Sequence, residues 1–291
     1  ALDWLRAARH RPDLFVGGHT HVVARTTVDG TAMLGPGAYG LRYGVVDLER
    51  VTPDSVDAWI RGVPVAWVDA VEPDTAIAGI VDRWAREIRP LTERVIATLA
   101  HDLPRSGREY ALGRLIADAQ RRAAGADIAM INNGGIRAEL RAGPVTWGDA
   151  FRVHPFENEI LRLGVRGATV RAAVEHALAG GRAAAHVAGM SVVYDARRPG
   201  GSRVVSITLD DGRLLDDGAV YTLVVNDFMA DGGDGYTMLV DAPRERTGLI
   251  DVQVLIDELT TRPQPVVAPA GSLFRAPDPA RNGNTTPPQP R

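Results

Sequence analysis

The chain has 291 residues, of which 45% are hydrophobic and 24% charged, values typical of a globular protein with one large domain or two modest ones. A net charge of −3 gives no electrostatic reason to expect a nucleic acid polymer or an anionic membrane as partner. The lack of cysteine excludes disulfides and thiolate chemistry, and no segment approaches the ~20 apolar residues of a membrane span.

The first part of the chain reads as a helix followed by short strands. Leu2–Ala8 is predicted to be helical, and Asp13–Gly18 is predicted to be a buried strand that ends in glycines. His19 and His21 follow at the end of that strand, where open α/β sheets place ligands. Further strands are expected at Val22–Val28, Thr31–Leu34 and Tyr43–Val51. We expect residues 1–61 to be the closing part of a sheet domain. We also expect the numbering to begin inside a larger protein.

Residues 62–92 are predicted to be a linker with a bridging helix. The helix is expected at Ala76–Ile88, because its apolar residues recur on one face and a Pro-Asp pair precedes it.

Residues 93–262 alternate between strand and helix patterns, which predicts a mixed α/β domain. The expected strands are Arg94–Ala100, Ile128–Ile131, Ile160–Val165, Met190–Tyr194, Val204–Leu209 and Thr222–Val225. The expected helices are Tyr110–Ala123, Gly167–Leu178 and Leu249–Leu259. Residues 263–291 are predicted to be a proline-rich disordered tail, of which 277–291 is the part with the clearest composition.

The stretch from Tyr221 to Tyr236 runs from a strand into a loop with three glycines. Phe228 and Asp234 lie on this loop, and an aromatic face beside a carboxylate suits a flat heterocycle with hydrogen-bonding groups. The alternative is a tight turn with a buried Phe and a capping Asp.

Asparagine is scarce, yet four of the six occur in loops that follow or flank predicted strands: Asn132, Asn133, Asn158 and Asn226. Arg137 follows the first pair, and its planar guanidinium matches phosphate or carboxylate oxygens. The alternative is an ordinary Asn-Gly turn with a solvated Arg.

Two further loops carry residues suited to a ligand. Phe156 stands after a proline and two residues before Asn158, where it either packs inward or offers a stacking surface. Arg105 and Arg108 precede a helix, where a cation opposes the helix dipole and needs either a bound anion or exposure to water.

Together these segments resemble the 5′-nucleotidase family. Five ordered motifs carry the resemblance: LGRLIADA at 112–119, NGGIR at 133–137, GPVTWGD at 143–149, PFEN at 155–158 and NDFMADGGDGY at 226–236. The resemblance implies a C-terminal substrate-binding domain of the 5′-nucleotidase type, preceded by the last part of a metallophosphoesterase β-sandwich domain. Glu157 departs from the family, which often has Gly there.

The resemblance also implies roles for individual residues. Phe156 and Phe228 would sandwich a base, Asp234 and Asn158 would hydrogen-bond the nucleoside, and Gly189 would lie under the base. Arg137, with one or both of Arg105 and Arg108, would hold phosphate or ribose oxygens, and Asn132 would lie near the phosphate or catalytic centre.

His19 and His21 resemble the last metal-ligand motif of the family, in which two divalent metal ions, Zn or Mn, activate water and clamp the phosphate. The earlier ligand motifs are missing from this sequence, and two His cannot hold a two-metal site. We therefore expect nucleotide binding without turnover from this chain alone.

Three functions stay open. The first is the substrate-specificity part of a metal-dependent nucleotidase or related phosphoesterase, monomeric and located outside the cytoplasm. The second is a module that only binds nucleosides or nucleotides. The third is a relative of the sulfur-oxidising thiosulfohydrolases, against which the aromatic pair argues.

Overall fold

In the computed structural model, the described residues are 7, 9–10, 12–52, 55–62, 72–106, 109–269 and 273–276. The chain divides into two compact units, Ala1–Arg83 and Trp84–Arg291. Apart from Ala7, the predicted helix Leu2–Ala8 lies outside the described residues, as do residues 277–291 and most of the connector at 62–73. The prediction of a disordered tail is wrong for its first part, because Val266 and Phe274 are buried and Phe274–Arg275 pairs with the strand Met190–Tyr194.

The first unit contains a small mixed sheet and a hairpin. The sheet has the order β1 (Leu14–Val16), β3 (Thr31–Pro36), β2 (Val23–Val28), with β1 parallel and β2 antiparallel to β3. The hairpin pairs β4 (Val45–Thr52) with β5 (Ser55–Gly62). The expected strands are therefore present within one to two residues of their predicted ends, but β1 is partly exposed and not buried as predicted, and β5 was not predicted.

Helix α2 (Thr75–Thr92) spans the boundary between the two units. It begins where Asp74 Oδ1 accepts hydrogen bonds from the backbone N–H groups of Ala76 (2.9 Å) and Ile77 (3.1 Å), which satisfies donors that lack helical partners. The helix runs longer than predicted. No residue of α2 is buried, so its apolar face is exposed in this structure.

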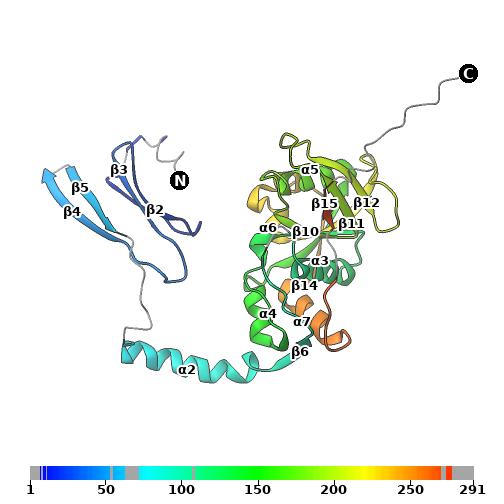
Figure 1. Cartoon of the computed structure of the whole chain (residues 1–291), viewed down its shortest axis with the longest axis horizontal. Coiled ribbons are helices and arrows are strands. Elements are labelled where there is room, and N and C mark those ends of the chain that lie inside the picture. The colour runs from blue at the N-terminus through cyan, green and yellow to red at the C-terminus, as the bar shows by residue number, and fades with distance from the viewer. Residues whose placement is uncertain are drawn as a thin grey trace, which may run out of the picture. The chain divides into compact units, whose positions relative to one another are not determined.

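The second unit is built around a five-stranded mixed sheet (Figure 1). Its strand order is β10 (Ala185–Ala188), β7 (Ile128–Asn132), β13 (Val220–Asn226), β9 (Glu159–Arg166) and β14 (Arg244–Ile250). Strand β13 is parallel to β7 and antiparallel to β9. Two of these strands, β10 and β14, are not predicted from the sequence, because β10 is short and rich in Ala and β14 begins with three charged residues. The end of β14, Leu249–Ile250, was predicted as the start of the last helix, which begins at Asp251 instead.

Both faces of this sheet are covered, since alternate residues of β7 enter different cores. Ala129 and Ile131 pack in a core shared with α3 (Ala111–Ala123) and α7 (Asp251–Thr261). Ile128 and Met130 pack in a second core with α5 (Gly167–Ala177) and with the sheet β12 (Val204–Leu209), β11 (Met190–Tyr194), β15 (Phe274–Arg275). The continuous apolar run of β7 is what a strand buried on both faces requires.

The remaining elements described in the second unit are one strand pair, two short helices and three 3₁₀ turns. Strands β6 (Val95–Leu99) and β8 (Gly143–Thr146) pair antiparallel. Helix α4 (Trp147–Val153) follows β8, and it begins at a capping box in which Thr146 and Asp149 exchange hydrogen bonds. Helix α6 (Asp227–Ala230) and three 3₁₀ turns, η2 (Asn133–Gly135), η3 (Gly233–Gly235) and η4 (Thr237–Leu239), complete the unit. Within the described residues no helix is long and apolar enough to cross a membrane.

Candidate nucleotide-binding site

The ends of three neighbouring strands bring the predicted loops to one edge of the five-stranded sheet. Strands β7 and β13 are parallel, so Asn132 and Asn226 end at the same edge. Strand β9 begins there, because Asn226 pairs with Ile160 in the antiparallel register of β13 and β9. The loops that carry Arg137, Phe156 and Phe228 are therefore neighbours, although up to about ninety residues of sequence separate them.

A chain of side-chain hydrogen bonds orients Asp234. Asn226 Oδ1 accepts the backbone N–H of Met229 (2.8 Å), so its Nδ2 is free to donate to Asn132 Oδ1 (3.2 Å). Asn132 Nδ2 in turn donates to Asp234 Oδ2 at 2.5 Å. The backbone donor fixes the orientation of the first amide, and each amide fixes the next group. Asp234 is exposed, so its carboxylate is held at the surface in a defined direction.

Asp234 is also held by its backbone. Its φ of 52° lies in the left-handed region, and its carbonyl oxygen lies 2.8 Å from Nε2 of His176 on α5. The His176 ring contacts Tyr236 edge to face at 4.7 Å between ring centroids. A strained backbone kept in place by its surroundings is common at ligand sites.

Glycines allow the loops to approach these side chains. A Cβ on Gly134 or Gly135 would lie 3.1 Å or 3.0 Å from the Asn132 amide. A Cβ on Gly233 would lie 2.5 Å from the ring of Phe228, which rests against this backbone. Any larger residue at these positions would therefore crowd the Asn132 amide or displace the Phe228 ring from this backbone.

Both candidate stacking rings are exposed. Phe156 is 55% and Phe228 46% exposed, so neither packs inward. The Arg137 guanidinium lies 5.6 Å from the centroid of the Phe156 ring, within cation–π range. The aromatic surfaces and a cation thus occupy the same edge of the sheet, while the base sandwich expected from the sequence stays a prediction.

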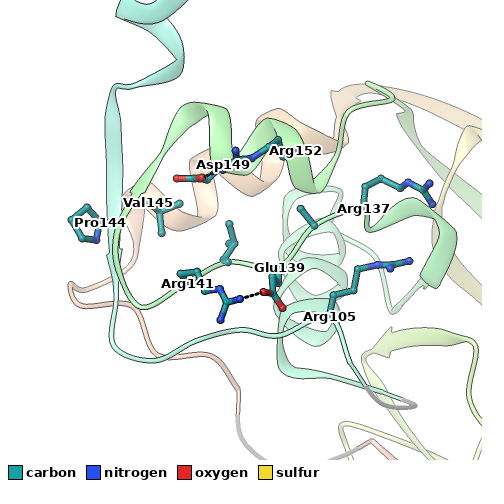
Figure 2. Close-up of a pocket in the computed structure, with 10 residues that line it drawn as sticks. Arg105, Arg137, Glu139, Arg141, Pro144, Val145, Asp149 and Arg152 are labelled. Carbon is teal, nitrogen blue, oxygen red and sulfur yellow. Dashed lines mark hydrogen bonds and ion pairs between the residues drawn. The ribbon is translucent and has the colours of Figure 1, made fainter. Parts of the chain in front are cut away.

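Arg105 and Arg137 converge on the loop between β7 and Leu140. Arg105 donates to the carbonyl oxygens of Ile136 and Asn133 (3.3 Å for the latter), and Arg137 Nη1 donates to Gly134 O at 3.3 Å. Figure 2 shows the two guanidinium groups extending in the same direction from neighbouring segments. Arg108 lies outside the described residues.

The cavity of about 460 Å³ beside these two arginines is not itself a cationic pocket. Its other charges are paired: Arg141 lies 2.5 Å from Glu139, and Arg152 pairs with Asp149. In Figure 2 the guanidinium groups of Arg105 and Arg137 point away from the Arg141–Glu139 pair. An anion would therefore meet these two arginines at the loop edge rather than inside the cavity.

Asn158 is tied to the start of α7. Its Nδ2 donates to Asp251 Oδ2 at 3.1 Å, and its carbonyl oxygen accepts the backbone N–H of Asp251 at 3.0 Å. Burial raises the pKa of Asp251 to about 6, although the bonds from Asn158 and Val252 oppose the rise. His154 is fully buried nearby, and burial lowers its pKa to about 4. The sequence analysis did not identify Asp251, His154 or His176 as residues of the site. Of the three, only His154 had a local signal, because it stands two residues before Phe156.

Gly189 does not belong to this site. Gly189 follows Ala188, the last residue of β10. Ala188 pairs with Ala129 and Ala185 pairs with Asn132, so Gly189 lies at the opposite end of the strands from Asn132. Its φ is 81°, and a Cβ there would lie 2.0 Å from the carbonyl oxygen of Asp127. The need for glycine at this position is a backbone requirement, and the expectation that it lies under a base is wrong.

The residues predicted as metal ligands, His19 and His21, lie in the first unit. Both are exposed, with φ of 62° and 61°, and the His21 ring contacts Tyr39 at 5.1 Å between centroids. Among the described residues, no group of three or more His, Asp or Glu side chains is placed to hold a metal ion. Two imidazoles alone do not fit a two-metal centre.

Comparisons with known proteins agree with the family and the fold. The family described as "5′-nucleotidase, C-terminal domain" matches residues 95–241, slightly more than half of the chain. The endonuclease YhcR of Bacillus subtilis is 30% identical over 226 residues, which cover 75% of this chain and 18% of that protein. A 5′-nucleotidase of Vibrio cholerae is 35% identical over 173 residues, which cover 56% of this chain and 30% of that protein.

Among solved structures, a 5′-nucleotidase precursor from Thermus thermophilus is similar with a TM-score of 0.72 and 27% identity. The match covers 94% of this chain and 61% of that structure, so the chain spans less than two thirds of the length of these relatives. The residues matched by the family contain all the loops of the site described above, but they end before Asp251. The chain belongs to the 5′-nucleotidase family, whose C-terminal domain it contains.

Proposed function

We propose that the edge formed by Phe156, Phe228, Asp234, Arg105 and Arg137 binds a nucleotide, and that this chain is the substrate-specificity part of a phosphoesterase that hydrolyses nucleotides to nucleosides and phosphate. The observation that carries the proposal is the pair of exposed Phe rings on two neighbouring loops beside an oriented carboxylate. Two aromatic rings exposed on neighbouring loops offer apolar faces on which a flat ligand can pack.

Each group has a role that follows from its chemistry. Phe156 and Phe228 would stack on the faces of a base, which is tolerant of base identity. Asp234 would accept hydrogen bonds from ribose hydroxyls, because its carboxylate is exposed and its other oxygen already accepts from Asn132. Arg137 and Arg105 would donate to phosphate oxygens, with Asn132 close to them.

Hydrolysis belongs to the proposal for the whole protein rather than to the described site. His19 and His21 would contribute to a metal centre only together with further ligands. A relative that is 31% identical over 253 residues is named a cell wall protein of Listeria monocytogenes, and we propose a location outside the cytoplasm for this protein too. The thiosulfohydrolase alternative is weaker, because a sulfur oxyanion offers no flat face to the two rings.

Three ligands test the site by parts. Equilibrium binding of AMP, adenosine and ribose 5-phosphate is measured by calorimetry with the 291-residue chain in the presence of EDTA. We expect AMP to bind more tightly than either of the other two, since each lacks the partner of one group of residues. Ribose 5-phosphate binding as tightly as AMP would exclude a role for the aromatic rings, and absence of binding by all three would overturn the proposal.

A further inference from the structure

Asp251, the first residue of α7, is buried at 1% exposure beneath the Phe156 loop. Its two carboxylate oxygens have separate partners: Oδ1 accepts the N–H of Val252 at 2.7 Å, and Oδ2 accepts from Asn158 Nδ2 at 3.1 Å. Its own N–H donates to the carbonyl oxygen of Asn158 at 3.0 Å. Asn158 is therefore held by one residue through both its main chain and its side chain.

His154 anchors the other end of the same loop. Its Nδ1 lies 3.0 Å from the carbonyl oxygen of Gly135, to which the neutral ring donates, and 3.6 Å from Asp251 Oδ2, which is too long for a hydrogen bond. The loop that carries Arg137 is fixed at the same place, because the N–H of Arg137 donates to Val153 O at 2.9 Å.

The exposed Phe156 thus stands between two anchored residues. Glu157, beside it, has a φ of 53°, which a non-glycine residue adopts only when its surroundings hold it there. On the far side, the N–H of Glu159 lies 3.3 Å from Asp227 Oδ2, at the start of the helix that carries Phe228. Asp251 is the buried group on which this loop rests.

We propose that Asp251 is a positioning residue for the base-binding part of the site, which holds the Phe156–Asn158 loop in the conformation that accepts a base. The inference rests on the proposed function, but its structural half can be tested without any ligand. One Nδ2 hydrogen of Asn158 is engaged by the carboxylate, so Asn158 keeps its Oδ1 acceptor and one further Nδ2 hydrogen for a ligand.

The variant Asp251→Asn has the same shape but only one acceptor oxygen, so it cannot accept from both Val252 and Asn158. Glu258→Gln is the matched control: Glu258 is also a buried carboxylate on α7, at 7% exposure, but it pairs with Arg122 and Arg262 and not with the loop. The side chain of Asn158 is only partly buried, so Asn158→Ala removes the same contact from the other partner without a large cavity.

In the ligand-free chain, hydrogen exchange of the segment 154–160 is followed by mass spectrometry. We expect faster exchange in this segment for Asp251→Asn and Asn158→Ala, and exchange like that of the unmodified chain for Glu258→Gln. Unchanged exchange in both Asp251→Asn and Asn158→Ala would overturn the positioning role, whatever the ligand proves to be.

Binding measurements with two ligands then distinguish an effect on base recognition from an effect on phosphate recognition. We expect Asp251→Asn to weaken AMP binding roughly tenfold, the loss typical of one hydrogen bond to a charged group, and to leave ribose 5-phosphate binding within twofold. Glu258→Gln should change neither. Equal losses for AMP and ribose 5-phosphate, or equal losses in Asp251→Asn and Glu258→Gln, would show a general structural effect and contradict the proposal. A chain that binds no nucleotide would overturn the proposed function alone.

Discussion

At the scale of single residues, the two phenylalanines carry the most specific expectation. Replacing Phe228 by Ala should weaken AMP binding by roughly 1–3 kcal/mol, by analogy with base stacking in single-strand binding proteins. The ring is 46% exposed, so the free energy of unfolding should change little. Calorimetry and chemical denaturation measure the two effects. Leu214→Ala, at a 67% exposed apolar position, is the control, and an equal loss of AMP affinity in it would exclude a stacking role.

Arg137 should act on the phosphate. Arg137→Ala is expected to weaken AMP binding by roughly 1.5–3 kcal/mol, the contribution of a hydrogen bond to a charged group, and to affect adenosine much less. Arg141→Ala is the matched control, because Arg141 lines the neighbouring cavity but pairs with Glu139. If AMP and adenosine lose the same affinity in Arg137→Ala, the guanidinium supports the loop or the Phe156 ring and not the phosphate.

At the scale of elements, the start of α6 is coupled to Asp234 through two amides. Asn226→Asp keeps the acceptor that caps the helix but removes the donor to Asn132, and it buries a charge. We expect the free energy of unfolding to fall by about 1–3 kcal/mol and adenosine binding to weaken, because Asn132 is no longer fixed. Denaturation and calorimetry check both parts. Asn284→Asp is the control, because it adds the same charge near the end of the sequence. Unchanged adenosine affinity in Asn226→Asp would show that Asn226 caps the helix but does not orient the site.

At the scale of the whole molecule, stability should fall in mild acid. Burial, with Arg114 and Arg105 nearby, lowers the pKa of His186 to about 3, and burial lowers that of His154 to about 4. Between these values and 6.5, the unfolded chain binds the protons that the folded chain excludes, so the free energy of unfolding is complete above pH 6.5 and decreases as the pH falls. Asp251 has the opposite effect on the free energy of unfolding between about pH 3.8 and pH 6, because its raised pKa lets the folded chain bind a proton before the unfolded chain does.

The substitution His186→Leu tests this balance. Each histidine contributes about 1.4 kcal/mol per pH unit in its window, and Asp251 offsets one of the two below pH 6. We expect the slope of the unfolding free energy between pH 6 and 4.5 to drop by about 1.4 kcal/mol per unit in the variant. Urea denaturation at three pH values measures it. His101→Leu, at an exposed position, should keep the slope of the unmodified chain, and an unchanged slope in His186→Leu would refute the assignment.

The 291-residue chain should bind nucleotide without hydrolysing it. His19 and His21 are the metal ligands that the sequence predicts, and two imidazoles do not clamp a phosphate between two metal ions. We expect no release of phosphate from AMP with added Mn²⁺ or Zn²⁺, and AMP binding unchanged by EDTA. Metal-dependent phosphate release by a purified sample would contradict this expectation.

The sequence by itself determined the strands and helices with strong apolar periodicity and the residues of the site loops. The buried strand at Ile128–Ile131 and the helix at Tyr110–Ala123 match β7 and α3 closely, because continuous apolar runs and helical spacing are local signals. Phe228, Asp234 and Arg137 were also evident as candidates, since they lie near glycines in loops, and Phe156 follows a proline; their roles in a site came from the family motifs.

Only the tertiary structure decided which of these residues meet. The register that pairs Asn226 with Ile160 brings loops from distant parts of the chain to one edge, and no local pattern encodes a register between distant strands. A second register, in which Ala188 of β10 pairs with Ala129 of β7, places Gly189 at the opposite end of the strands from the site. Asp251 lay in an unremarkable helical pattern; its role depends on burial beneath Asn158, a contact that exists only once α7 packs against the start of β9.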